Sequence, residues 1–73
     1  MKYFDEFKEI LETKVHGKEI TMETELKGLG IDSLDLVEII MDAEEKYGIE
    51  FDNDELSGFT TVGDVVETIN KKL

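Results

Sequence analysis

Ser33 is the side chain of this 73-residue sequence best placed to take part in chemistry. It follows a glycine-containing loop and lies between Asp32 and Asp35 at the expected start of a helix. A hydroxyl in that position is exposed and held by the helix, but no neighbouring base would activate it as a nucleophile. The placement favours a serine that another enzyme modifies. From position alone, a serine that merely begins a helix is the alternative.

The other candidates for catalysis or metal binding lack the partners they would need. The only histidine, His16, ends the first predicted helix, where a basic group usually complements the helix dipole. There is no cysteine, which excludes disulfides, thiolate catalysis and Cys-ligated metals. Residues 52–57 begin like a calcium loop but place Leu56 at a ligand position and Ser57 where glycine makes the turn. We expect no enzymatic activity and no dedicated metal site, only loose binding of divalent cations to acidic surface.

The net charge of the chain indicates which kinds of molecule it could bind. Nineteen acidic and eight basic side chains give a formal net charge of −11, which argues against nucleic acid and favours a basic protein surface. The longest apolar run covers residues 39–41, far short of the roughly 18–20 residues that a membrane span needs. Charged residues at positions 2, 5 and 6 interrupt any signal peptide. We therefore expect a cytoplasmic monomer with a single domain over residues 1–73.

Helical spacing of apolar residues and capping patterns define the elements that would position Ser33. A first helix is predicted from residue 3 to Val15, with Gly17 as its left-handed end. A long loop over 17–32 follows, held to the core by scattered apolar residues. The second helix is predicted from its N-cap Asp32 to Gly48.

Two further helices complete the predicted fold. Asp52 and Glu55 resemble a capping box for a short helix over residues 53–57. The last helix is predicted to begin after Thr61 and to bury apolar residues as far as Leu73. The sequence thus predicts an all-α fold: a small four-helix bundle of three longer helices and a short third one, with a long loop between helices one and two.

The second predicted helix is apolar on two faces. One face forms a core stripe of Leu36, Ile39, Ile40, Ala43 and Tyr47. The other presents Leu34, Val37 and Met41 beside the acidic residues Asp35, Glu38, Asp42 and Glu45, with Glu44 close by. Apolar side chains bordered by acids suggest a surface that docks on a basic partner. The alternative is that all three belong to the core, and for Leu34 the two interpretations weigh equally.

The run from Leu29 to Glu38 resembles the attachment-site region of acyl carrier proteins, whose Asp-Ser-Leu signature stands here as Asp32-Ser33-Leu34. The resemblance extends upstream to Leu26 and downstream to residues 59–64, and it covers essentially the whole chain. It implies a four-helix fold and a 4′-phosphopantetheine arm esterified to Ser33, donated by coenzyme A through a phosphopantetheinyl transferase. The thiol of that arm would carry acyl chains as thioesters, which fits the absence of cysteine.

The resemblance also implies roles for other residues. Residues that would contact basic patches on fatty-acid synthesis enzymes are Asp35, Val37, Glu38, Met41, Glu44 and Glu45. An acyl chain could enter the bundle, where candidate lining residues are Phe7, Ile39, Ile40, Ala43, Ile49, Phe51 and Ile69. Two departures stand out: Phe51-Asp52 replaces a proline often found before the third helix, and Lys27-Gly28 replaces an acidic pair.

Three kinds of protein therefore remain open at the level of sequence. A carrier for fatty-acid synthesis is the leading interpretation. A specialised carrier, of the polyketide, D-alanyl or peptidyl type, is the next. An acidic protein-interaction module that is never modified is the alternative from another class.

Overall fold

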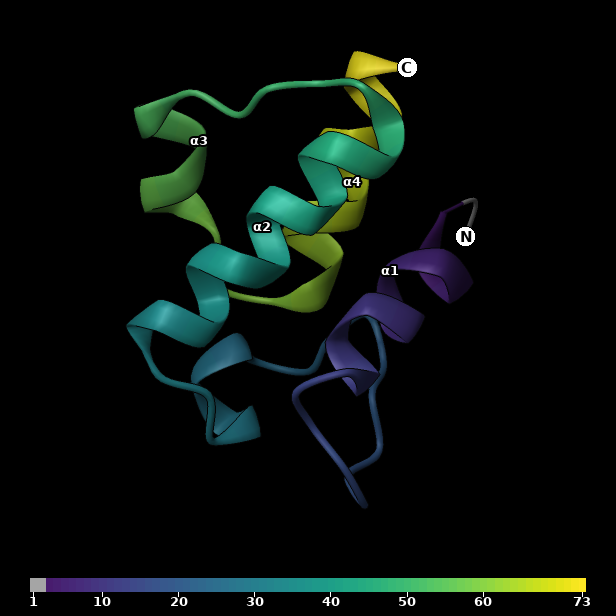
Figure 1. Ribbon diagram of the computed structural model, residues 1–73, viewed down its shortest axis with the longest axis vertical. Helices are drawn as coiled ribbons and strands as arrows, with labels where there is room; N and C mark the ends of the chain where they lie inside the picture. The colour runs from purple at the N-terminus through teal and green to yellow at the C-terminus, as the bar shows by residue number, and fades with distance from the viewer. Residues whose placement is uncertain (1–2) are drawn as a thin grey trace.

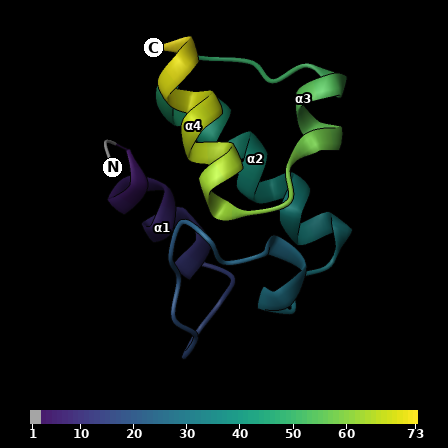
Figure 2. The same ribbon diagram turned by 180° about the vertical axis from the view of Figure 1, so that it is seen from behind.

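The computed structural model describes residues 3–73 and shows an α-helical fold. The helices are α1 (Phe4–Glu12), α2 (Ser33–Tyr47), α3 (Asn53–Gly58) and α4 (Val62–Lys72), with a 3₁₀ turn η1 (Leu26–Leu29) in the loop between α1 and α2. Within residues 3–73 the only β-type pairing is an isolated bridge between Glu25 and Thr61. The predicted all-α fold of three longer helices and a short third one is confirmed. As Figure 1 and Figure 2 show, α1 and α3 lie on opposite sides of α2 and α4.

The end of α1 differs from the prediction. The helix stops at Glu12, and Thr13 caps it, donating a hydrogen bond from its hydroxyl to the Ile10 carbonyl at 2.7 Å. A threonine hydroxyl that binds a backbone carbonyl competes with the helical hydrogen bonds, which accounts for the earlier stop. Val15 is nevertheless buried. Gly17 has the predicted left-handed conformation (φ +75°), but it turns the following loop and does not cap the helix.

The remaining helices begin where the capping patterns predict. The Asp32 carboxylate accepts the Asp35 N–H at 2.9 Å, and α2 ends at the left-handed Gly48. Both α3 and α4 begin with a capping box, in which the N-cap side chain and the residue three positions on bond to each other's backbone N–H. These local hydrogen bonds fix the direction in which each helix leaves its loop.

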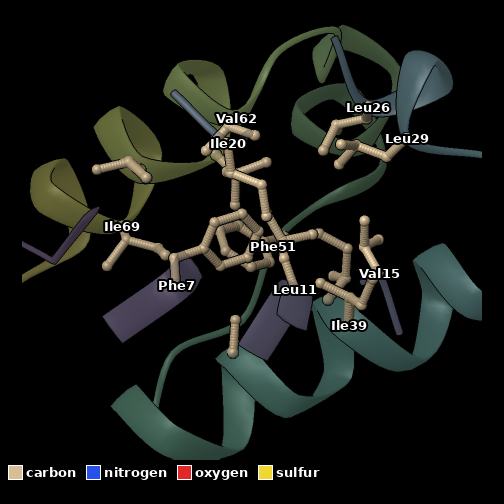
Figure 3. Packing of buried hydrophobic residues seen from close by; sticks show 14 residues of the cluster. Phe7, Leu11, Val15, Ile20, Leu26, Leu29, Ile39, Phe51, Val62 and Ile69 are labelled. Atoms are coloured by element: carbon tan, nitrogen blue, oxygen red, sulfur yellow. The ribbon is translucent and has the colours of Figure 1, made fainter. Parts of the chain in front are cut away.

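Fourteen hydrophobic side chains form the core, and no polar or charged side chain is buried with them among the described residues. Phe7 and Leu11 of α1 meet Ile39 of α2 and Ile69 of α4 at its centre (Figure 3). Leu73 is 56% exposed, so the predicted burial of this last residue is wrong: it lies beyond the final helical turn.

The predicted core stripe of α2 is confirmed for its central members and is looser at the ends. Ile39, Ile40 and Ala43 are buried, whereas Leu36 and Tyr47 are half-buried. The Tyr47 hydroxyl donates a 2.7 Å hydrogen bond to Glu6 and so ties the end of α2 to α1.

The long loop is held along the start of α4. The Leu26 N–H donates to the Thr60 carbonyl at 2.9 Å, and the Met22 carbonyl accepts the Gly63 N–H at 2.8 Å. A Cβ on Gly63 would stand 2.8 Å from that same Met22 oxygen, so the close approach requires glycine. These contacts hold η1 and the preceding loop against the start of α4. No helix in the described part of the chain is long and apolar enough to cross a bilayer.

Candidate functional site

Ser33 is the first residue of α2, and its side chain is exposed. Gly30, in the left-handed conformation, ends η1, and the half-buried Ile31 holds the short link before the helix. The neighbouring Asp32 carboxylate accepts the Asp35 N–H and therefore acts as a helix cap. The hydroxyl is thus presented to other molecules at the positive end of the α2 dipole.

The second apolar face of α2 is exposed, which excludes the alternative that it belongs to the core. Leu34 is 76% exposed, Val37 52% and Met41 58%. We call these three residues the outer face of α2. Large apolar side chains exposed together on one helix are typical of a protein-interaction surface.

The acidic residues beside the outer face differ in what they contact. Glu38 forms a 2.6 Å ion pair with Lys14, and the hydrogen bond from Lys14 to this carboxylate raises the pKa of Lys14. Glu45 is exposed and Asp35 half-buried. Glu44 contacts its own chain: its carboxylate accepts the Phe51 N–H at 2.8 Å and holds the loop between α2 and α3. Of the predicted docking acids, Glu44 alone is thus tied to the backbone of its own chain among the described residues.

An apolar groove of about 230 Å³ lies between α2 and α3. Its lining residues are Leu36, Val37, Ile40, Met41, Glu44, Leu56 and Phe59. Only Ile40 of the seven predicted acyl-pocket residues is among them. The others lie elsewhere: Phe7, Ile39, Ala43 and Ile69 are fully buried in the closed core, Phe51 is buried, and Ile49 is half-buried beside that core.

The groove residues that the sequence interpretation missed are Leu36, Leu56 and Phe59. Leu56 is the one large apolar residue of the polar helix α3, and it is 39% exposed. Phe59 follows α3 directly and meets the ring of Phe51 edge to face, with centroids 5.3 Å apart. An isolated leucine in a six-residue polar helix would have been the available clue, because that helix needs an apolar contact to stay in place.

A second, smaller hollow of about 150 Å³ opens beside Ser33. Ser33 and Asp32 form one edge of it, and the side chains of Leu36 and Phe59 line both this hollow and the groove between α2 and α3. The exposed hydroxyl, the hollow and the apolar groove therefore follow one another along the same side of α2.

Comparison with known proteins agrees with this arrangement. The family model described as the phosphopantetheine attachment site matches residues 5–69. An acyl carrier protein of Clostridium perfringens (strain 13 / Type A) is 51% identical over 71 residues, covering 93% of each chain. The chain belongs to the acyl carrier protein family. A similar acyl carrier protein from Thermotoga maritima is 42% identical, and the match covers 96% of this chain and 90% of that protein. Another, from Coprothermobacter proteolyticus, is 43% identical, and the match covers 99% of this chain and 92% of that protein.

Membership makes this chain a carrier that bears a phosphopantetheine prosthetic group and catalyses no reaction of its own. The group supplies a terminal thiol on which an acyl chain is held as a thioester, and this cysteine-free carrier has no thiol of its own. The residues present fit such a group: the carrier offers an exposed hydroxyl at a helix N-terminus, with apolar hollows beside it for the less polar parts of arm and cargo.

Proposed function

We propose that the arm is esterified to the Ser33 hydroxyl and that the loaded carrier delivers acyl thioesters to the enzymes of fatty-acid synthesis. The observation that carries this proposal is the exposed Ser33 side chain at the first position of α2. A phosphodiester at that position gains from the positive end of the helix dipole. Asp32 caps the helix with its carboxylate, and Leu34 begins the exposed apolar surface that an enzyme would contact.

The proposed modification is carried out by a transferase, because the described residues place no base to activate the serine. In the proposed step the Ser33 oxygen attacks the phosphorus of coenzyme A that bears the pantetheine. A new oxygen–phosphorus bond forms, the pyrophosphate bond breaks, and adenosine 3′,5′-bisphosphate leaves. The hydroxyl proton passes to the transferase.

The outer face of α2 is proposed as the docking surface for the transferase and the synthesis enzymes. Its apolar side chains Val37 and Met41 would enter a partner's pockets, while Asp35, Glu38 and Glu45 meet basic residues. Such charge pairs chiefly accelerate encounter and set orientation, which suits a carrier that must visit several enzymes. A partner that pairs with Glu38 has to replace Lys14. Glu44 would join this surface only after releasing the Phe51 N–H.

The groove between α2 and α3 is proposed as the first resting place of the acyl chain. Its apolar walls and its continuity with the hollow beside Ser33 support this. The other predicted pocket residues, such as Phe7, Ile39 and Ile69, would line a deeper cavity only if the core opened around a longer chain. We further propose that the carrier acts as a cytoplasmic monomer and that residues 1–73 form one domain, which the single contiguous core supports.

The test is the intact mass of the purified protein after incubation with coenzyme A, magnesium and a broad-specificity phosphopantetheinyl transferase. We expect a gain of one phosphopantetheine in the wild type and none in Ser33→Ala, with unchanged helicity because Asp32 still caps α2. A gain that persists in Ser33→Ala would place the arm elsewhere. No gain in the unmodified, folded wild type would favour an acidic interaction module in place of a carrier.

A further inference from the structure

The hollow beside Ser33 combines an apolar wall with one positive charge. Leu26, Ile31, Leu36 and Phe59 supply the wall, and Lys27 is the only cationic residue lining it in the described part of the chain. Lys27 lies in η1, and the described residues give its ammonium no ion-pair partner. An ammonium without an ion-pair partner can bind an anionic group that is attached to the neighbouring hydroxyl.

A phosphodiester on Ser33 would otherwise meet negative charge. Asp32 lines the same hollow, and Asp35 lies in the first turn of α2. Only one Asp32 oxygen is used in capping, through the Asp35 N–H. The phosphate would thus stand beside the Asp32 carboxylate on a chain whose net charge is already −11. A cation that reaches the phosphate offsets this repulsion more effectively than the helix dipole alone.

The apolar wall matches the part of the arm that follows the phosphate. Phosphopantetheine continues from its phosphodiester into a carbon bearing two methyl groups before its first amide. A branched hydrocarbon of this size gains by leaving water for an apolar recess. The phosphate and the two methyl groups are close together in the arm, as Lys27 and the wall of Leu36 and Phe59 are in the hollow.

We infer that the Lys27 ammonium pairs with the phosphodiester of the arm while the hollow holds the arm's dimethyl segment against Leu36 and Phe59. This inference rests on the proposed attachment at Ser33. It makes Lys27 a positioning residue: the arm leaves the serine already directed toward the groove between α2 and α3, because Leu36 and Phe59 line both spaces.

The chain offers a matched control in Lys18. Its ammonium lies 3.5 Å from the Gly28 carbonyl, so it belongs to the same loop region, yet it does not line the hollow. Replacing either lysine by methionine removes the same charge from the loop. Only the Lys27 substitution should reduce docking of the arm in the hollow.

The experiment compares the phosphopantetheinylated forms of wild type, Lys27→Met, Lys27→Arg and Lys18→Met by NMR. Intact mass first establishes that each carries the arm. The readouts are the ³¹P chemical shift of the phosphodiester and the cross-peaks between the arm's methyl protons and the Phe59 ring. In the wild type we expect these cross-peaks, and a ³¹P shift that moves toward the free-arm value as salt screens the pair.

In Lys27→Met we expect the ratio of docked to free arm to fall about two- to fivefold, the range of an exposed ion pair. Lys27→Arg should retain most of the docking, and Lys18→Met should resemble the wild type. If docking of the arm fell equally in Lys27→Met and Lys18→Met, the cause would be the overall charge of the loop, and the inference would be overturned. Loaded wild-type protein without cross-peaks to Phe59 would overturn it too, while leaving attachment at Ser33 intact. Failure to load at all would instead refute the proposed function.

Discussion

The two sides of α2 differ in how tightly they are packed. Toward α1 and α4 the helix buries Ile39 and Ala43 completely, in a core that the long loop also covers (Figure 3). Toward α3 it borders an open groove, and α3 itself buries no residue. α3 is held by its capping box, the contact between Phe51 and Phe59, and one ion pair to α4. Stability is therefore concentrated on one side of α2 and open space on the other.

The largest contrast should come from truncating one apolar residue on each side. Phe7→Ala empties the centre of the closed core and should cost about 3–5 kcal/mol of unfolding free energy, enough to unfold much of so small a domain. Leu56→Ala, on the partly exposed α3, should cost less than about 1 kcal/mol. Urea unfolding followed by circular dichroism measures both. Equal costs would contradict the division into a tight and a loose side.

Alanine substitutions at two glycines test the same difference in packing between the two sides of α2. Gly63→Ala on α4 forces a Cβ to within 2.8 Å of the Met22 carbonyl oxygen and should destabilise the protein by about 1–3 kcal/mol. Gly58→Ala at the end of α3 meets no atom within 4 Å and should be neutral or slightly stabilising. Thermal unfolding of the two variants measures this difference in stability. A destabilised Gly58→Ala would mean that α3 is more constrained than its contacts indicate.

Acid should weaken the start of α4 through one carboxylate. The backbone N–H groups of Thr61 and Thr60 bind Asp64 at 3.0 and 2.9 Å and hold its pKa below the ordinary 3.8. Because the pKa is lowered in the folded state, the stabilisation is complete above the unfolded value and is lost as pH falls through the folded one. We expect Asp64→Asn to remove about 1 kcal/mol of this pH dependence below pH 4.

The control for this titration is Glu67→Gln, an exposed acid on the same helix. Both changes remove one negative charge, so both relieve the general repulsion of an acidic chain equally. Stability against pH, measured by urea unfolding between pH 6 and 3, should flatten only in Asp64→Asn. Identical profiles for the two variants would show that overall charge, and not the capping box, governs the acid response.

Sequence patterns predicted the helices better than the groove between α2 and α3. Helical periodicity and capping residues are local, and they placed Asp32, Asp52 and Thr61 correctly. They also separated Ile39 from the exposed Met41 on one helix. The groove depends on how far α3 stands from α2, which loop length and packing decide together. The resemblance to acyl carrier proteins placed Phe7 among residues that would line a pocket inside the bundle core, and Phe7 does lie in that core, which is closed.

The structure of the loop between α1 and α2 could not be predicted from the sequence for a similar reason. The contact between η1 and Thr60 is a backbone hydrogen bond between segments more than thirty positions apart. No periodicity records such pairing, since backbone groups are the same for every residue. The substitution of Lys27 for an acidic residue was visible, yet its place in the hollow beside Ser33 required the fold.

The smallest expected effect concerns the ion pair that joins α3 to α4. Lys72 lies 2.9 Å from the Glu55 carboxylate, whose pKa is lowered first by the Asp52 N–H and then by this lysine. Lys72→Met should leave global stability almost unchanged, as is usual for exposed pairs. Amide exchange of α3 should nevertheless rise by roughly twofold, because local opening of α3 does not require the core to unfold.

Lys71→Met, its neighbour on α4, removes the same charge without breaking that pair and should leave exchange in α3 unchanged. If both variants loosened α3 equally, the cause would be the general field of the lysines at the end of α4. If Lys72→Met lowered global stability as much as it opened α3, the two sides of α2 would unfold together. The proposed entry of an acyl chain into the groove would then weaken the core as well, and a domain with so small a core has little stability to spare.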